Sequence, residues 1–401
     1  MTKKMMQGFP VAKENRIPRD LWDRPPWNRW SFQHIREILP TTEVWRGSGP
    51  SWQIPEHPLD LGQIKFSDHR GEKTCIADWL NNNYADGIAV IHHGELCYER
   101  YFNNMTERTV HLSQSMAKSI TSAIAGILVG RGLLDPQESI TTYLPELKRT
   151  AWQDAQLRHA LDMTSGVRYD EDYEAPDSDI AATDIASGWR KPHRNVQNFQ
   201  CMWDQILSLK HLVRPHGELF EYRSIETDVL AHCMERVTRT RLAELVSQEL
   251  WQPLGAQENA CFTVDSAGYS LADGGFNATL RDYSRFGQML CNGGVGNGQR
   301  IVPVEWIDDT LDANPDIFHQ PYNVGITNGA YRNQFWIRDV DRKVMMARGV
   351  FGQLIYIDID NQLTITRLAS WPEFLSTERK LDDYCAIDAI TKHLTEVTHA
   401  P

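Results

Sequence analysis

The sequence has no long hydrophobic run. No stretch reaches the roughly 18 uncharged apolar residues that a membrane helix needs, and the basic start MTKKMMQGFP has no apolar segment of the signal-peptide type behind it. We therefore expect no signal peptide, no membrane partner and a cytoplasmic location.

Cysteine is sparse and shows no pairing pattern. The chain has 7 cysteines, an odd number, and no two are spaced as CxxC. A disulfide framework is therefore not expected in so long a chain. No HExxH motif or spaced Cys/His set is present, so the sequence predicts no metal site. The absence of GxSxG excludes the nucleophile elbow of the α/β-hydrolases.

Positive charge is also in deficit. The 41 Lys and Arg residues are outnumbered by 53 Asp and Glu residues, which gives a formal net charge of −12. Nucleic-acid binding needs a basic surface that displaces counterions from phosphates, so no nucleic-acid partner is predicted. A hydrophobic content of 41% over 401 residues is enough for one large core or two ordinary ones.

Tryptophan and proline are concentrated near the N-terminus. Residues 1–60 predict an irregular segment that wraps a core, with one short helix around Phe32–Leu39. A β-hairpin is predicted next, because a Gly-Glu turn separates two β-rich runs, Ile88–His93 and Leu96–Phe102. The pattern is then mostly helical, although Arg168–Arg194 has no clean period and is interpreted as a long functional or flexible loop.

Extended runs return near the C-terminus. The candidates are Asn333–Arg338, Val344–Gly349, Gln353–Ile359 and Gln362–Leu368, followed by an amphipathic helix over Asp382–Val397. Strands at both ends of the chain with helices between them predict an α/β (α+β) fold, with one sheet assembled from distant segments and flanked by helices. The expected parts are a wrapping segment (1–60), a sheet domain (61–132 and 255–401) and an inserted, mostly helical domain (133–254).

A serine and a lysine stand at the head of a strongly apolar predicted helix. In HLSQSMAKSITSAIAG, from His111 to Gly126, Ser115 and Lys118 would share one helix face. Burial would lower the pKa of Lys118, and a neutral amine could take the proton of the Ser115 hydroxyl. The helix start would favour a developing oxyanion. S-x-x-K alone is expected about once by chance in such a chain, so this interpretation depends on its context.

Two later motifs supply that context. Tyr222, in GELFEYRSIETDVLAH, is predicted at a turn before a helix, where a phenol beside an ammonium is favoured to ionise and can exchange protons with Ser115 and Lys118. On its own, Tyr222 could equally be a packing residue. In ARGVFGQ, glycines would let a substrate lie close to the backbone. The N–H of Val350 is a candidate oxyanion donor beside that of Ser115, and an ordinary glycine-containing edge strand is the alternative.

These motifs together resemble the serine β-lactamase and penicillin-binding-protein superfamily, in which S-x-x-K is a signature. GRGLLDPQESITTYLPEL, LDMTSGV and GGFNATLRDYSRFGQMLCNGG follow in the usual order, and the resemblance covers about residues 85–372. Within the superfamily the chain looks most like the 6-aminohexanoate-dimer (nylon-oligomer) hydrolases and the related class C-like (family VIII) carboxylesterases. The segments that extend this match are PPWNRWSF, YDEDYEAP, YRSIETDVL, FGQLIYIDID and LASWPE. The resemblance implies a β-lactamase/transpeptidase-like fold.

The resemblance also implies roles for individual residues. Ser115 would be the acylated nucleophile, Lys118 the general base and Tyr222 a proton shuttle. The residues that match substrate-contacting positions are Tyr173, which would contact the scissile amide nitrogen, Asp184, which would contact a substrate ammonium, and Trp336, which would form an aromatic pocket wall. No cofactor is implied, the partner is a small-molecule ester or amide substrate, and a homodimer is left open.

The chain departs from the penicillin-recognising members at two places. Their third strand carries Lys-Thr-Gly or a close relative, where this chain has Ala347-Arg348-Gly349, and its tyrosine motif ends in Ser224 rather than asparagine. Both changes weaken a β-lactamase or DD-peptidase role, although Arg348 would suit an acidic substrate if it faces the site. The sequence predicts a serine hydrolase acting on an ester or linear amide. A β-lactamase or DD-peptidase-like enzyme and a non-catalytic binding or sensor protein are the alternatives.

Overall fold

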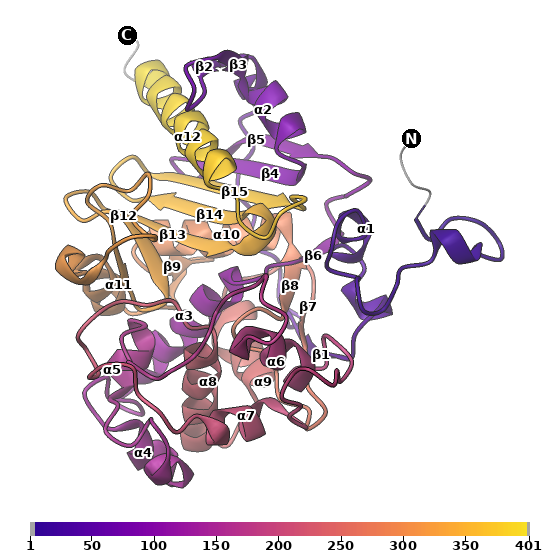
Figure 1. Cartoon of the computed structure of the whole chain (residues 1–401). Helices are drawn as coiled ribbons and strands as arrows, with labels where there is room; N and C mark the ends of the chain where they lie inside the picture. Colours follow the sequence, from indigo (N-terminus) through magenta and orange to yellow (C-terminus); the bar gives the residue numbers. More distant parts are fainter. Residues whose placement is uncertain (1–4, 399–401) are drawn as a thin grey trace.

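Seven antiparallel strands form the central sheet of the computed structural model, which describes residues 5–398 (Figure 1). Their order is β11-β12-β13-β14-β15-β4-β5. Because β15 pairs with β4, the two ends of the chain meet in one sheet, as predicted. The strands are β4 (Ala85–His92), β5 (Glu95–Tyr101), β11 (Ala330–Arg332), β12 (Phe335–Asp339), β13 (Val344–Gly349), β14 (Gln353–Asp358) and β15 (Leu363–Ala369).

Both faces of this sheet are covered by helices. Alternate residues of a strand point to opposite faces, and on β13 Met345 and Ala347 join the core that contains α3 and α10, whereas Val344 and Met346 pack with α12. Figure 1 shows α12 on one side of the sheet and α3 on the other. Two buried faces explain why these strands have near-continuous apolar runs. The helices are α3 (Met116–Gly130), α10 (Leu280–Cys291) and α12 (Thr377–Thr398).

A second sheet, of four strands, was not predicted. Its order is β1-β7-β8-β6, and each strand has only three or four residues, too few to show a period. The sheet matters for function because β6 leads directly to Ser115. Its strands are β1 (Thr41–Val44), β6 (Val110–Leu112), β7 (Ala260–Thr263) and β8 (Phe276–Thr279), and two small two-stranded sheets pair β2 (Lys65–Ser67) with β3 (Lys73–Cys75) and β9 (Val295–Gly296) with β10 (Gln299–Arg300).

The region between the sheet segments is mainly helical, and Figure 1 shows most of these helices on the side of the sheet away from α12. The interpretation of 168–194 as a long functional or flexible loop is wrong in part, because the helix α6 lies inside it. The Ser178 hydroxyl caps that helix by accepting a hydrogen bond from the N–H of Ala181, and Ile180 and Ile185 are buried. The helices here are α4 (Ile140–Tyr143), α5 (Leu157–Leu161), α6 (Asp179–Ala186), α7 (Met202–Ser208), α8 (Ile225–Thr238) and α9 (Leu242–Val246).

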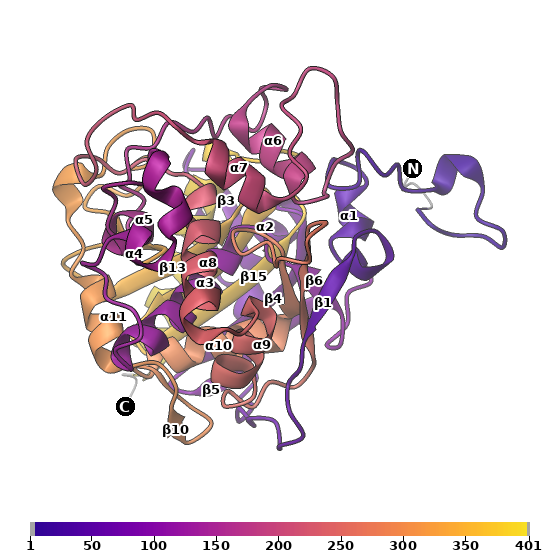
Figure 2. The same ribbon diagram turned by 90° about the horizontal axis from the view of Figure 1, so that it is seen from below.

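The N-terminal segment begins as an excursion that projects from one side of the molecule and then lies along that side around α1, as Figures 1 and 2 show in indigo. The short helix predicted around 32–39 is confirmed only in part, because α1 (Asn28–Ser31) ends before this range and the range itself holds one 3-10 turn, Ile35–Glu37. Trp22 is fully buried and packs edge-on against Trp189. This contact places the segment beside the loop that carries α6.

The division into three parts stays a prediction, and its residues 1–4 and 399–401 lie outside the described residues. None of the helices in the described part of the chain combines the length and apolarity that crossing a membrane requires. The cysteines of the described residues are all free thiols. Two further helices complete the structure, α2 (Ile76–Asn82) and α11 (Val304–Leu311).

Candidate active site

Ser115 stands at the turn between β6 and α3, beside the end of β13. The helix begins at Met116, so Ser115 is only partly buried while the following residues are covered. A Cβ atom on Gly349 would lie 2.6 Å from the carbonyl oxygen of Ser113 and 3.0 Å from the backbone nitrogen of Ser115. Glycine at this position therefore lets the strand touch the serine turn itself, a use the sequence did not indicate.

Lys118 is buried beneath Ser115, and hydrogen-bond acceptors surround its ammonium group. Its Nζ lies 3.0 Å from Ser115 Oγ, 3.0 Å from Ser224 Oγ and 2.8 Å from the carbonyl oxygen of Asp273. The side chain is 1% exposed. An ammonium in so dry a place needs acceptors on every hydrogen, and this one has them. Ser115 and Lys118 therefore share a helix face, as predicted.

Tyr222 completes the group from the turn that precedes α8. Its hydroxyl is hydrogen-bonded to both Ser115 and Lys118, and the Lys118 Nζ lies 5.1 Å from the centre of its ring. The opposite side of the ring stacks on Trp336, with ring centres 5.6 Å apart and planes 21° from parallel. Three polar atoms from two segments far apart in the sequence thus form one continuous path for protons.

The protonation state of Lys118 differs from the prediction. Burial opposes its charged form, as the sequence indicated, but Tyr222, Asp273 and Glu171 outweigh burial and hold its pKa above the ordinary value. Burial also raises the pKa of Tyr222, although the Lys118 charge opposes this, so the prediction of an easily ionised phenol is wrong as well. The resting site therefore holds an ammonium and a neutral phenol.

Glu171 is a part of the site that sequence reasoning missed. Glu171 belongs to the acidic run Asp170–Asp172, a pattern typical of a solvated loop, but its side chain turns inward. Its Oε1 accepts hydrogen bonds from the hydroxyl groups of Ser224 and Tyr173, the latter at 2.7 Å, and its Oε2 accepts one from the Ser224 N–H at 2.9 Å. Burial raises its pKa. The spacing of two between Glu171 and Tyr173 was the available signal, since such residues share a side in extended chain.

Replacing Glu171 with glutamine should move the acid limb of the pH–kcat/KM profile to lower pH. The Glu171 charge favours the charged form of Lys118, so its removal makes the amine lose its proton at lower pH. The check is a pH–rate profile of Glu171→Gln against wild type on a p-nitrophenyl ester. An Asp172→Asn variant serves as the control, because Asp172 is exposed and should leave the limb in place. A limb that stays fixed in both variants would remove Glu171 from the proton network.

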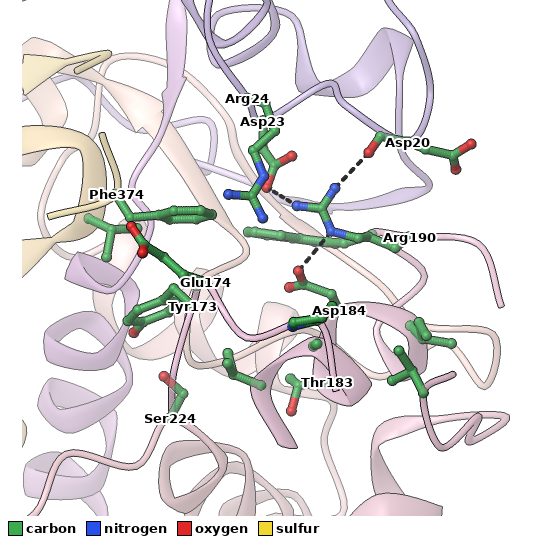
Figure 3. A pocket seen from close by; sticks show the side chains of 18 of the residues that line it. Asp20, Asp23, Arg24, Tyr173, Glu174, Thr183, Asp184, Arg190, Ser224 and Phe374 are labelled. Atoms are coloured by element: carbon green, nitrogen blue, oxygen red, sulfur yellow. Dashed lines mark hydrogen bonds and ion pairs between the residues drawn. The ribbon is translucent and has the colours of Figure 1, made fainter. Parts of the chain in front are cut away.

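A pocket of about 580 Å³ lies over this group (Figure 3). Ser115, Val350 and Tyr173 all line it, as predicted, and Tyr173 stacks on Phe374 with ring centres 5.5 Å apart. Among the described residues, no acceptor is seen for the backbone N–H of Ser115 or Val350. These two N–H groups are therefore available to an oxygen bound in the pocket.

Asp184 also lines the pocket, but its carboxylate is already engaged. Arg190 Nε donates to Asp184 Oδ2 at 3.0 Å, and the same guanidinium donates to Asp23 Oδ2 at 2.6 Å (Figure 3). Burial raises the pKa of Asp184 to about 7 despite Arg190, and the neighbouring charge of Asp23 adds to the rise. The Asp184 carboxylate is therefore already paired with Arg190.

The structure does not bring Arg348 or Trp336 into the pocket lining. Arg348 lies on the same face of β13 as Val344 and Met346, and this face is covered by α12. There the Arg348 Nη1 donates a hydrogen bond to the Tyr384 hydroxyl at 2.7 Å. Trp336 lies behind Tyr222 and supports its ring from the far side. Within the described residues, no group of three His, Cys, Asp or Glu side chains is arranged to hold a metal ion.

Comparisons with known proteins give a consistent result. The beta-lactamase family model matches residues 84–387. The 6-aminohexanoate-dimer hydrolase of Paenarthrobacter ureafaciens is 31% identical over 373 residues, which cover 91% of each chain. The solved structure of a candidate 6-aminohexanoate-dimer hydrolase from Bacillus anthracis has a TM-score of 0.87 at 29% identity and covers 96% of this chain and 98% of that chain. A family VIII carboxylesterase, at 14% identity and a TM-score of 0.58 over 77% of this chain and 96% of its own, shares the fold.

Proposed function

Since the chain belongs to the beta-lactamase family, we propose that it is a serine hydrolase that cleaves an ester or a linear amide through an acyl-enzyme on Ser115. The observation that carries the proposal is the 3.0 Å contact between Lys118 Nζ and Ser115 Oγ, with the Tyr222 hydroxyl bonded to both. A protein that only bound ligands would have no use for a buried ammonium held against a serine hydroxyl. The name of the P. ureafaciens relative, a hydrolase of a linear amide, supports the same reaction class.

In the proposed cycle, Ser115 Oγ attacks the carbonyl carbon and gives its proton to the Lys118–Tyr222 pair. The carbonyl oxygen becomes an oxyanion, and the N–H groups of Ser115 and Val350 would stabilise it at the start of α3. The tetrahedral intermediate collapses when the bond to the leaving oxygen or nitrogen breaks and that atom takes the proton back from the pair. Water then attacks the acyl-enzyme by the same route, which releases the acid and restores Ser115.

This cycle requires the Lys118–Tyr222 pair to have lost one proton. Both groups hold their protons more tightly than usual, since the pKa of each is raised. The reactive form is therefore populated as pH rises, and kcat/KM should increase toward alkaline pH. Lys118 and Tyr222 titrate as a coupled pair, so the rise of kcat/KM with pH reports the pKa of the pair and not that of either residue.

The direct test is a covalent one. The protein is incubated with a fluorophosphonate probe and digested for mass spectrometry, and turnover of p-nitrophenyl acetate is followed in parallel. We expect an adduct on Ser115 and a turnover that the probe abolishes. If intact, folded protein shows neither an adduct nor turnover, the hydrolase proposal is refuted and the alternative of a non-catalytic binding or sensor protein is supported.

A β-lactamase role has less support, and nitrocefin measures it. The strand that carries a cation toward the substrate in penicillin-recognising relatives presents Arg348 to α12 instead. We therefore expect nitrocefin turnover to be far slower than ester turnover. A nitrocefin rate equal to the ester rate would reverse this ranking.

Replacing Tyr173 with phenylalanine should harm amide substrates more than esters. Its hydroxyl lies at the pocket, bonded to Glu171 at 2.7 Å, and can turn to the nitrogen of a scissile amide. An ester offers no such N–H group, so the loss should be about tenfold for the amide and smaller for a matched ester. The measurement is kcat/KM for an anilide and an ester of one acid. Equal losses would mean that the hydroxyl makes no contact with the nitrogen.

A further inference from the structure

Arg24 brings a guanidinium to the pocket without any acceptor from the protein. It comes from the N-terminal segment and lies over the ring of Phe374, with its Cζ 4.1 Å from the ring centre. In the part of the chain that the structure describes, no hydrogen bond or ion pair reaches this side chain. Figure 3 shows it between Phe374 and Arg190, on the pocket side of the segment.

The other cations of the pocket are already taken. Arg190 binds both Asp23 and Asp184, at 2.6 Å and 3.0 Å. Lys191 lies at the exposed rim, 3.8 Å from the carboxylate of Asp20. Arg24 thus feels the charges of Asp23, Asp184 and Glu174, and none of the three carboxylates is seen to form an ion pair with it within the described residues. It is the cation of the pocket that is left uncommitted.

The surroundings of Arg24 favour an anion of a definite shape. Arg24 is half-buried, and burial lowers its pKa although the charges of nearby acids oppose the shift. A planar fork of N–H donors fits a carboxylate with two parallel hydrogen bonds. The lining of the pocket also includes the apolar side chains of Phe374, Leu271 and Ile180, which suit an alkyl chain.

We propose that the pocket binds a substrate chain that ends in a carboxylate, held by Arg24 while the ester or amide group lies at Ser115. This inference rests on the proposed function for its reaction and adds the substrate class. It also separates the chain from an enzyme that would select an ammonium at Asp184, since Asp184 is held by Arg190 and an ammonium would face Arg24.

The test compares p-nitrophenyl esters of adipic acid (as the monoester), hexanoic acid and 6-aminohexanoic acid, which present an anion, an apolar end and a cation on similar chains. Wild type should show the highest kcat/KM for the adipate ester. In Arg24→Met the ratio of adipate to hexanoate rates should fall by about tenfold to a hundredfold. In the matched control Lys191→Gln, which removes a cation from the exposed rim, the ratio should change by about twofold or less.

Two further arms separate failure of the inference from failure of the proposed function. Ser115→Ala cannot form an acyl-enzyme, so calorimetric binding of adipate to it reports the pocket alone. Adipate should bind Ser115→Ala and bind more weakly when Arg24→Lys, which keeps the charge but loses the fork, is added. Binding of adipate without any ester turnover in wild type would refute the proposed hydrolase activity but support the carboxylate site at Arg24. The opposite result is a higher kcat/KM for the 6-aminohexanoate ester, with that preference lost in Asp184→Asn. It would overturn the carboxylate site at Arg24 and still support the proposed hydrolase activity.

Discussion

Replacing Lys118 with methionine is expected to lower kcat/KM for a p-nitrophenyl ester by about three orders of magnitude or more. Methionine fills most of the same volume but removes the group that lies 3.0 Å from Ser115 Oγ. Without it, Tyr222 also loses the charge beside it that favours its ionised form. Nucleophile and base act as a unit, so the loss should not be made up by the groups that remain.

The variant should still fold, because the acids around Lys118 can take up protons. Burial raises the pKa of Glu171 and of Asp273, and removal of the ammonium raises both further. Lys380→Met is the matched control, since Lys380 is a second lysine whose pKa burial lowers, to about 8, and it lies on α12 across the sheet. Thermal melting confirms folding of both variants. A Lys118→Met rate within tenfold of wild type would refute the assigned base.

The sequence predicted best where one short segment carried the information. A spacing of three on an apolar helix is enough to place Ser115 and Lys118 together, and the structure has them in contact. The strands β13 and β14 were predicted equally well, because both faces of the sheet are buried and their sequences are therefore continuous apolar runs. The four-stranded sheet was missed because β6, at three residues, shows no period at all.

The charge of Lys118 could not be predicted from its own segment. Burial alone lowers the pKa of a lysine, and that was the expectation. The opposite outcome depends on Tyr222, Asp273 and Glu171, which the fold brings from positions far along the chain. Only contacts between distant segments reveal that the pKa of Lys118 is raised. The sequence of the helix alone therefore predicts a pKa shift in the wrong direction.

The sequence could not predict, for a similar reason, that the N-terminal segment forms one wall of the pocket. Tryptophan and proline content indicates a wrapping segment but not which surface it meets. Trp22 fixes that surface by packing on Trp189 and donating a hydrogen bond to its carbonyl oxygen. Asp23 and Arg24 are carried to the pocket as a consequence. The facing of Arg348 was not predictable from strand alternation either, since Met345 and Ala347 on one face of β13 are as apolar as Val344 and Met346 on the other.

Replacing Tyr222 with phenylalanine is expected to reduce kcat/KM for an amide by about two to three orders of magnitude. The ring would keep its stack on Trp336, so the substitution removes little more than the hydroxyl. That hydroxyl is bonded to Ser115 and Lys118 and would return the proton to the leaving nitrogen. An amide nitrogen cannot leave without a proton, whereas p-nitrophenolate can. The loss on a p-nitrophenyl ester should therefore be clearly smaller.

Kinetics on an anilide and a p-nitrophenyl ester of one acid measure this difference, and Tyr322→Phe provides the matched control. The Tyr322 hydroxyl accepts a hydrogen bond from the Tyr222 N–H at 3.2 Å and belongs to the same aromatic cluster, but no contact joins it to Ser115. Its loss should leave both rates near those of wild type. If Tyr222→Phe slows the two substrates equally, the hydroxyl serves the attack by Ser115 alone, and the leaving group takes its proton directly from Lys118. If neither rate changes, Tyr222 does not belong to the proton path.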